Sequence, residues 1–178
     1  PMNPILPFIM AGDPSLAALP GLLAEARSLG LDCLELGLPH SDPIADGPVL
    51  QAAAQRAIAA GATPGKVLEA LAGIAASPDL VLFTYVNPLL QIGTEVLLDL
   101  LPRTPVKALL VVDLPDGEEP DFERRLRQAG FPMVPLLAPT TSPERAATLL
   151  AARPDPGPGA PFAQRFAYVV ARLGVTGA

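Results

Sequence analysis

The sequence predicts an α/β fold built on a parallel sheet, because apolar, strand-like runs alternate along the chain with segments of helical spacing. Parallel neighbours need long crossover connections, which helices usually supply. The runs are apolar almost throughout, as expected when both faces of a sheet are covered. We expect strands at residues 5–10, 33–36, 80–85, 108–112, 133–137 and 166–170.

The first helix is expected between the first two strands. Asp13 or Ser15 can cap its start, Pro14 or a neighbour would lie in the first turn, and Gly30 closes it. Its apolar face would consist of Leu16, Leu19, Leu22 and Leu23.

The later helices carry similar start and stop signals. Residues 49–60 form a helical stretch that stops at Gly61, and Thr63 then caps another helix with Pro64 at its first position. The apolar stripe of that helix would be Val67, Leu68, Leu71 and Ile74. Further helices are expected at residues 95–101, 121–129 (ended by Gly130) and 143–152.

Two architectures fit this order: an open doubly wound sheet and a (β/α)8 barrel of the TIM-barrel type. The first strand–helix turn, residues 11–15, lacks the G-x-G-x-x-G pattern of dinucleotide binders. The barrel is favoured because polar residues follow the strands, at the end where barrel enzymes keep their active sites. These residues are Asp13, Glu35, 41–46, Asn87, Asp113 and Thr176.

The chain of 178 residues predicts a single domain, residues 1–178. One segment departs from the alternation. Residues 153–161 contain four prolines, so we expect an exposed Pro/Gly loop before the sixth strand.

The composition excludes several classes of function. One cysteine and one histidine cannot form an internal disulfide or a structural zinc site, and they nearly exclude Ser-His-Asp chemistry. A net charge of −6 without a basic cluster argues against a nucleic-acid partner. No apolar run is long enough to span a membrane, and we find no signal peptide, so a cytoplasmic location is expected. Acid–base chemistry must therefore fall mainly on the 18 carboxylates, with Tyr85 and Tyr168 as candidate helpers.

Two carboxylates stand out. Glu35 lies inside an apolar strand, where it would form a buried salt bridge, reach solvent at the strand end, or act as a general acid or base with a raised pKa. Asp46 lies in the following loop, where an Asp before Gly-Pro is also ordinary turn chemistry. Together the two could flank one small substrate.

Other polar residues have a simpler interpretation beside a functional one. His40 is more often a loop residue than a base, and Asp113 can cap the loop that follows it. Tyr85 and Tyr168 are typical of core tyrosines with a local hydroxyl partner. The turn at residues 174–177 suits a mobile lid but also any tight turn.

Several motifs resemble the tryptophan synthase α-subunit family. Residues 8–14 (FIMAGDP) are similar to its first strand and turn, and residues 34–51 (LELGLPHSDPIADGPVLQ) to its central motif. YVNP at 85–88, DLP at 113–115 and GVTGA at 174–178 follow in the same order. The resemblance covers the whole chain and is weakest across residues 153–165.

The resemblance implies a (β/α)8 barrel that cleaves indole-3-glycerol phosphate to indole and glyceraldehyde 3-phosphate, with no cofactor in this subunit. It implies that Glu35 shuttles the proton at indole C3 and that Asp46 binds the indole N–H. Phe8 and Tyr168 would surround the substrate, and Thr176 would engage Asp46 from a lid that includes Gly174 and Gly177. Ser41, Asp42 and Pro115 would face a β subunit, which carries pyridoxal phosphate, in an α2β2 assembly.

Two departures from the family pattern have consequences. His40 replaces the usual aromatic residue after the proline, which would alter the partner interface or the pocket rim. A barrel of this kind has roughly 250 residues, so we expect this chain to cover about the first six βα units. Strands seven and eight, the backbone amides that hold the phosphate, and the N-terminal helix would then be absent.

Two alternative functions follow. A chain without the phosphate-binding part would be a noncatalytic α-like module that binds or regulates a β-type partner. A less favoured alternative is another phosphosugar lyase or isomerase on a barrel scaffold.

Overall fold

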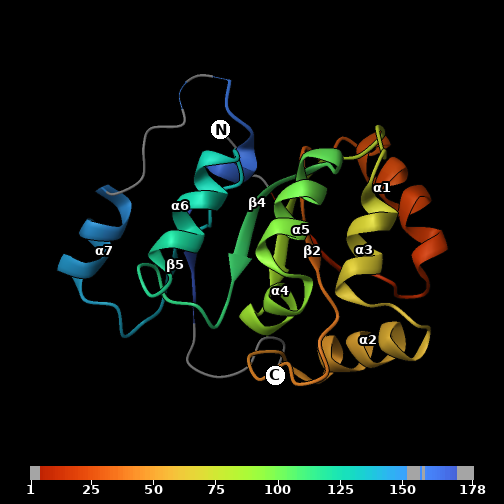
Figure 1. Cartoon of the computed structure of the whole chain (residues 1–178), viewed down its shortest axis with the longest axis horizontal. Helices are drawn as coiled ribbons and strands as arrows, with labels where there is room; N and C mark the ends of the chain where they lie inside the picture. Colours follow the sequence, from red (N-terminus) through yellow and green to blue (C-terminus); the bar gives the residue numbers. More distant parts are fainter. Residues whose placement is uncertain (1–4, 152–156, 158, 172–178) are drawn as a thin grey trace.

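The computed structural model describes residues 5–151, 157 and 159–171, and it contains a parallel sheet whose strands follow sequence order (Figure 1). Four strands pair in the order β1 (Phe8–Met10), β2 (Cys33–Gly37), β3 (Asp79–Thr84) and β4 (Val106–Val111). Sequential order is that of a barrel, whereas a doubly wound sheet reverses direction at a switch point.

A second pair of parallel strands continues this order. β5 (Leu136–Leu137) pairs with β6 (Tyr168–Val169), and an isolated parallel bridge joins Leu109 of β4 to Met133. The predicted strand 133–137 is shorter than expected because Pro135 has no N–H to donate to a ladder.

The helices occupy nearly the predicted positions. They are α1 (Leu19–Ser28), α2 (Pro48–Ala59), α3 (Pro64–Leu71), α4 (Val86–Ile92), α5 (Thr94–Leu100), α6 (Pro120–Gln128) and α7 (Pro143–Ala151). Short 3-10 turns are η1 (Leu16–Ala18), η2 (Leu101–Arg103) and η3 (Phe162–Gln164). In Figure 1 helices α6, α5 and α3 stand side by side in front of the strands.

The start signals are confirmed at two helices and one start is missed. Ser15 caps the first helical turn by accepting from the Ala18 N–H, and Thr63 caps α3 by accepting from the Lys66 N–H. Helix α4 was not predicted, because its short sequence contains Pro88. Proline is compatible with the first turn of a helix, where N–H groups have no partner within the helix.

The two faces of the sheet pack against different layers. Leu34, Leu36, Leu82 and Leu109 belong to a cluster shared with helices α1, α3, α4, α5 and α6, which we call the outer face. Residues one position away in the strands belong to a second cluster, the inner face, which contains Cys33, Val81, Phe83, Ala108 and Leu110. Side chains alternate along a strand, so the same five-residue β2 serves both layers.

The segment around η3 covers part of the inner face. Ala163 is fully buried there, and the Gln164 side-chain amide donates to the carbonyl oxygens of Lys107 and Gly130 at 2.9 and 3.0 Å. Of the predicted Pro/Gly loop at 153–161, the described residues are Gly157 and 159–161. Gly159 is exposed, while Gly157, Ala160 and Pro161 are half-buried.

Among the described residues, no helix is both long enough and apolar enough to cross a membrane.

Candidate active site

Glu35 lies on the inner face of the sheet, in the middle of β2. Its neighbours in the register are Phe8 of β1 and Val81 of β3, and only 6% of the residue is exposed. Within the described residues no salt bridge joins Glu35 to a cation. Burial raises the pKa of its carboxyl group to about 7, because a charged carboxylate is poorly solvated there. Glu35 is therefore suited to hold and release a proton near neutral pH.

Aromatic side chains stand next to Glu35 on the inner face. The rings of Phe8 and Phe83 meet edge to face with their centroids 5.4 Å apart, and Phe83 meets Tyr168 at 6.4 Å. Burial, and then the charge of Glu35, raise the pKa of the Tyr168 hydroxyl, which indicates that the two side chains are close. Phe8 and Tyr168, the two predicted substrate contacts that the structure describes, thus gather around Glu35.

Gly37 makes room for this aromatic group. A Cβ atom at Gly37 would overlap the Phe8 ring, so a larger residue would displace Phe8. In the sequence Gly37 is only one residue of a motif. The need for a glycine at this position cannot be predicted there, because it comes from Phe8 on the neighbouring strand.

Asp46 is fixed in the loop between β2 and α2, with 4% of the residue exposed. Its N–H donates to the Pro43 carbonyl at 3.0 Å, and its own carbonyl accepts from Gln51 Nε2 at 2.7 Å. Its carboxylate Oδ1 accepts from the Tyr85 hydroxyl at 2.9 Å. Burial raises the pKa of Asp46, while the hydrogen bond from Tyr85 and the nearby His40 oppose that rise.

Tyr85 is a site residue whose partner could not be identified from the sequence. It follows β3 directly and is 3% exposed. Besides donating to Asp46, its hydroxyl group accepts a hydrogen bond from the Ala45 N–H at 3.0 Å. Its partner Asp46 is 39 positions away in the sequence, whereas a local partner was expected. The available signal was a lone tyrosine at the carboxyl end of an apolar run, which is equally typical of a core residue.

Two other polar residues at this end of the sheet have structural contacts. The His40 ring lies against the Tyr85 ring, with centroids 5.2 Å apart. Asp113 Oδ1 accepts from the Val86 N–H at 2.7 Å, so Asp113 ties the end of β4 to the start of α4 rather than capping its own loop.

The remaining predicted site residues fall into two groups. Ser41, Asp42 and Pro115 are exposed. The predicted lid residues Gly174, Thr176 and Gly177 lie outside the described residues.

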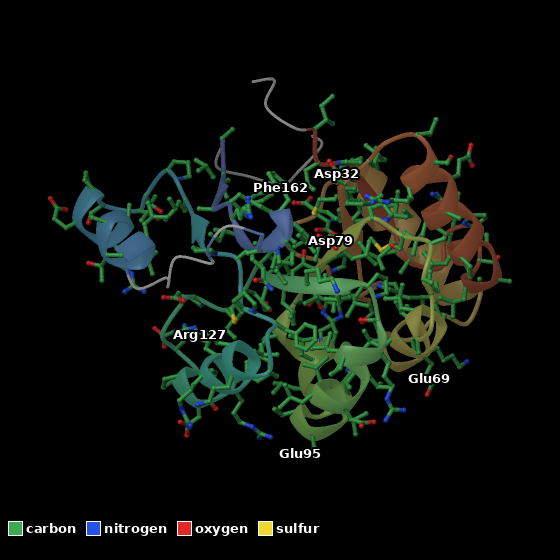
Figure 2. All side chains as sticks on the ribbon, turned by 90° about the horizontal axis from the view of Figure 1, so that it is seen from above. Asp32, Glu69, Asp79, Glu95, Arg127 and Phe162 are labelled. Carbon is green, nitrogen blue, oxygen red and sulfur yellow. The ribbon has the colours of Figure 1, made fainter. Side chains whose placement is uncertain are left out.

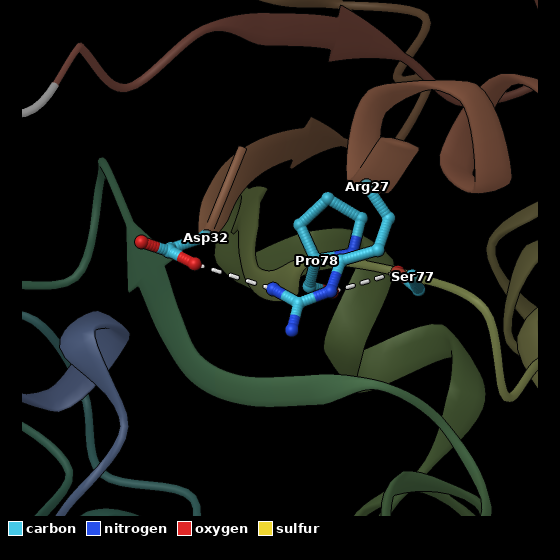
Figure 3. A network of polar contacts seen from close by, with 4 residues as sticks. All are labelled: Arg27, Asp32, Ser77 and Pro78. Carbon is cyan, nitrogen blue, oxygen red and sulfur yellow. Dashed lines mark hydrogen bonds and ion pairs between the residues drawn. The ribbon is translucent and has the colours of Figure 1, made fainter. Parts of the chain in front are cut away.

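A different polar region lies at the amino ends of the strands. Figure 2 shows Asp32, Asp79 and Phe162 near one another, whereas Glu69, Glu95 and Arg127 lie on the surrounding helices. A cavity of about 400 Å³ is lined there by Arg27, Asp32, Ser77, Asp79 and residues 159–162. Arg27 is paired with Asp32 at 3.2 Å (Figure 3). The Ser77 hydroxyl donates to the Pro78 carbonyl. Because the side chain of Asp32 is 87% exposed, this ion pair is mostly solvated.

The described part of the chain also contains no group of three or more His, Cys, Asp or Glu side chains arranged to hold a metal ion. Cys33 is buried and forms no disulfide, and burial raises the pKa of its thiol to about 12. The inner face with Glu35, together with the Asp46 loop, is therefore the candidate active site.

The chain matches the family model described as "Tryptophan synthase alpha chain" over residues 2–178. Two proteins with the same description are similar to the chain: one from Synechococcus sp. (strain CC9902), 42% identical over 175 residues, and one from Prochlorococcus marinus (strain MIT 9313), 41% identical over 175 residues. Each alignment covers 97% of this chain and 61% or 60% of the relative. The chain thus spans about three fifths of the length of these curated relatives.

Solved structures agree in fold. The structure of Mycobacterium tuberculosis tryptophan synthase superposes with a TM-score of 0.82 at 28% identity, covering 99% of this chain and 65% of that one. Tryptophan synthase subunit alpha from Campylobacter jejuni gives a TM-score of 0.81 at 28% identity, with 99% and 67% covered. These likenesses support the predicted α/β fold of TIM-barrel type.

Proposed function

The chain belongs to the tryptophan synthase alpha chain family, and we propose that it carries the lyase site that cleaves indole-3-glycerol phosphate to indole and glyceraldehyde 3-phosphate. One observation carries the proposal. A buried carboxyl group with a pKa near 7, Glu35, lies among aromatic side chains on the inner face of the sheet, and a second buried carboxylate, Asp46, lies in the loop that follows the same strand. The pair offers a proton and a fixed negative charge to one flat, apolar substrate.

Glu35 is the proposed general acid. Carbon–carbon cleavage requires a proton at indole C3, and placing it there breaks the aromaticity of the ring. The bond between C3 and the side chain then breaks as the adjacent hydroxyl group becomes the aldehyde and gives its proton to the Glu35 carboxylate. An acid is most effective for such a step when its pKa lies near the working pH. The buried Glu35 meets that requirement, because its neutral form is well populated at pH 7.

Asp46 is the proposed counter-charge for the indole nitrogen. Protonation at C3 leaves positive charge on the ring, and a carboxylate held at the N–H stabilises it without having to reorganise. Tyr85 engages Oδ1, and among the described residues no hydrogen-bond donor engages Oδ2. That second oxygen is available to accept from the indole N–H.

The other proposed contacts follow the family resemblance. Phe8 and Tyr168 would lie against the indole and glycerol parts of the substrate, and Thr176 would reach Asp46 from a lid. Ser41, Asp42 and Pro115 would contact a β subunit that carries pyridoxal phosphate, so no cofactor is proposed for this chain. The exposure of these three residues is compatible with an interface. We propose that the reaction takes place in the cytoplasm.

Indole release from indole-3-glycerol phosphate tests the proposal, measured on the full-length product of the gene. We expect Glu35→Gln to lower kcat by about 10²–10⁴-fold, the usual contribution of a general acid. We expect Asp46→Asn to lower it by about 10²-fold, since one preorganised charge is removed.

Glu123→Gln is the matched control. Glu123, in α6, is also a buried glutamate, but its carboxylate accepts from the N–H of Gly117 in the loop before that helix, and the side-chain oxygen of a glutamine can still accept that bond. Undiminished turnover in both site variants would contradict the assigned roles. Binding of a β-type partner without any indole release from the wild type would favour the noncatalytic function instead.

A further inference from the structure

We propose that Gln51, in helix α2, is a positioning residue that holds the peptide carrying Asp46 in place. The inference rests on the proposed function, because it gives Gln51 a task in the same reaction. Gln51 touches the backbone of Asp46 and acts on the substrate only through that residue.

The hydrogen bond from Gln51 satisfies a carbonyl that the helix cannot reach. Gly47 is the N-cap of α2, and the Gln51 N–H donates to the Gly47 carbonyl at 3.0 Å. The Asp46 carbonyl lies one residue outside the helix and accepts from the Gln51 side chain at 2.7 Å. In the described residues this carbonyl has no other donor, and a buried carbonyl without a partner is unfavourable.

Asp46 is therefore held at three atoms by three different residues. Pro43 accepts from its N–H, Gln51 donates to its carbonyl, and Tyr85 donates to its carboxylate. Tyr85 alone fixes one oxygen but leaves the backbone free to turn about it. The bond from Gln51 removes that freedom, so the direction of Oδ2 is set before the substrate arrives.

Helix α2, which carries Gln51, is joined to the end of β1 by an ion pair and by close packing. Arg56 pairs with both carboxylate oxygens of Asp13, through Nε at 3.1 Å and Nη2 at 2.6 Å. Gly12 approaches the same region so closely that a Cβ there would lie 2.7 Å from the Cβ of Ala62 and 3.3 Å from that of Ala57. The sequence offers Asp13 as a candidate helix cap, whereas in the structure the Asp13 carboxylate pairs with Arg56 and Ser15 is the cap.

The support matters because a fixed charge helps only where it is held in position. A misplacement of about 1 Å at a reacting group can cost about 10²-fold in rate. A positioning residue that acts by this route should affect kcat more than KM, and only while Asp46 keeps its charge.

A double-mutant cycle tests the inference on the full-length product of the gene. Gln51→Met keeps the length of the side chain and removes the amide donor, and Gln55→Met is the control on the exposed side of the same helix. We expect Gln51→Met to lower kcat about 10-fold with little change in KM, and Gln55→Met to leave both unchanged. In an Asp46→Asn background, Gln51→Met should cause no further loss of kcat, because the charge that it positions is gone.

The outcomes separate the two proposals. If Asp46→Asn lowers kcat but Gln51→Met does not, or if Gln51→Met causes the same additional loss in both backgrounds, the positioning role is wrong and the proposed function stands. If Asp46→Asn has no effect, the role of Asp46 and the positioning role of Gln51 are both wrong, and if the wild type releases no indole, the proposed function is wrong as well. Should Gln51→Met fail to fold, Gln51→Glu replaces it, since an ionised carboxylate has the same shape and cannot donate to the Asp46 carbonyl.

Discussion

The outer and inner faces of the β1–β4 sheet differ in composition although their residues alternate along the same strands. The outer face is rich in leucine, and Leu36, Leu80, Leu82 and Leu109 are fully buried against the helices. The inner face mixes small and aromatic side chains with one buried carboxyl group, Glu35. The difference shows that alternate residues of the same strands have different roles. The residues that point outward stabilise the barrel wall, and those that point inward carry the proposed chemistry.

The largest expected change in stability comes from removing an outer leucine. Leu82→Ala deletes a side chain with no exposed surface, and we expect it to lower the free energy of unfolding by about 3–4 kcal/mol through lost burial and a cavity. Urea unfolding measures the change. Leu90→Ala is the control, because Leu90 is 69% exposed, and it should change the stability by less than about 0.5 kcal/mol. Equal losses of stability in Leu82→Ala and Leu90→Ala would contradict the structural role assigned to the outer face.

On the inner face, Glu35→Gln should stabilise the protein at high pH. Burial raises the pKa of Glu35 from 4.5 to about 7, so the folded state favours the neutral carboxyl group. Its contribution to stability is fully present below pH 4.5 and is lost as the pH rises through 7. Glutamine does not titrate, so the variant should match the wild type at pH 4 and gain up to about 3 kcal/mol by pH 8.

Paired urea titrations between pH 4 and 8 measure this difference, in which all other titrating groups cancel. A gain that stays constant over the whole range would show that Glu35 is not ionised unfavourably in the fold. If Glu35→Gln gains stability only at high pH and also loses turnover, Glu35 serves catalysis at a cost in stability.

Packing on the inner face is tested at Gly37. An added methyl group at Gly37→Ala would overlap the Phe8 ring, and we expect a loss of about 2 kcal/mol as the ring is displaced. Gly65→Ala is the matched control on α3, where a Cβ meets nothing within 4 Å, and it should stabilise the helix by about 0.5–1 kcal/mol. Thermal unfolding distinguishes the two signs, and a stabilising Gly37→Ala would contradict the close approach of Phe8.

The smallest expected change comes from a single hydroxyl group. Tyr85→Phe removes the bonds to Asp46 Oδ1 and from the Ala45 N–H, which should cost about 1 kcal/mol of stability. Turnover should fall about 10-fold because Asp46 loses one of its supports. Tyr168→Phe is the comparison for stability and should change it less. An unchanged kcat in Tyr85→Phe would show that the hydroxyl does not orient the carboxylate.

The sequence by itself determined the local elements and their order, because the signals that begin and end a helix act within a few residues. Thr63 with Pro64 starts α3 as predicted, Ser15 caps the first turn, and the alternation of strands and helices predicted the parallel sheet. The pairing of Glu35 with Asp46 as candidates also came from the sequence, through the motif that contains both. Their catalytic roles, with those of Phe8, Tyr168 and Thr176, stay predictions.

Only the tertiary structure decided which distant groups meet. The Tyr85 hydroxyl reaches Asp46 across 39 positions, and Asp13 pairs with Arg56 across 43. No local rule predicts such pairs, because they depend on how neighbouring strands and helices pack. The pKa of Glu35 has the same origin: a glutamate in an apolar run could have been salt-bridged or solvated, and only the layers on both sides of β2 deprive it of water and of a cation.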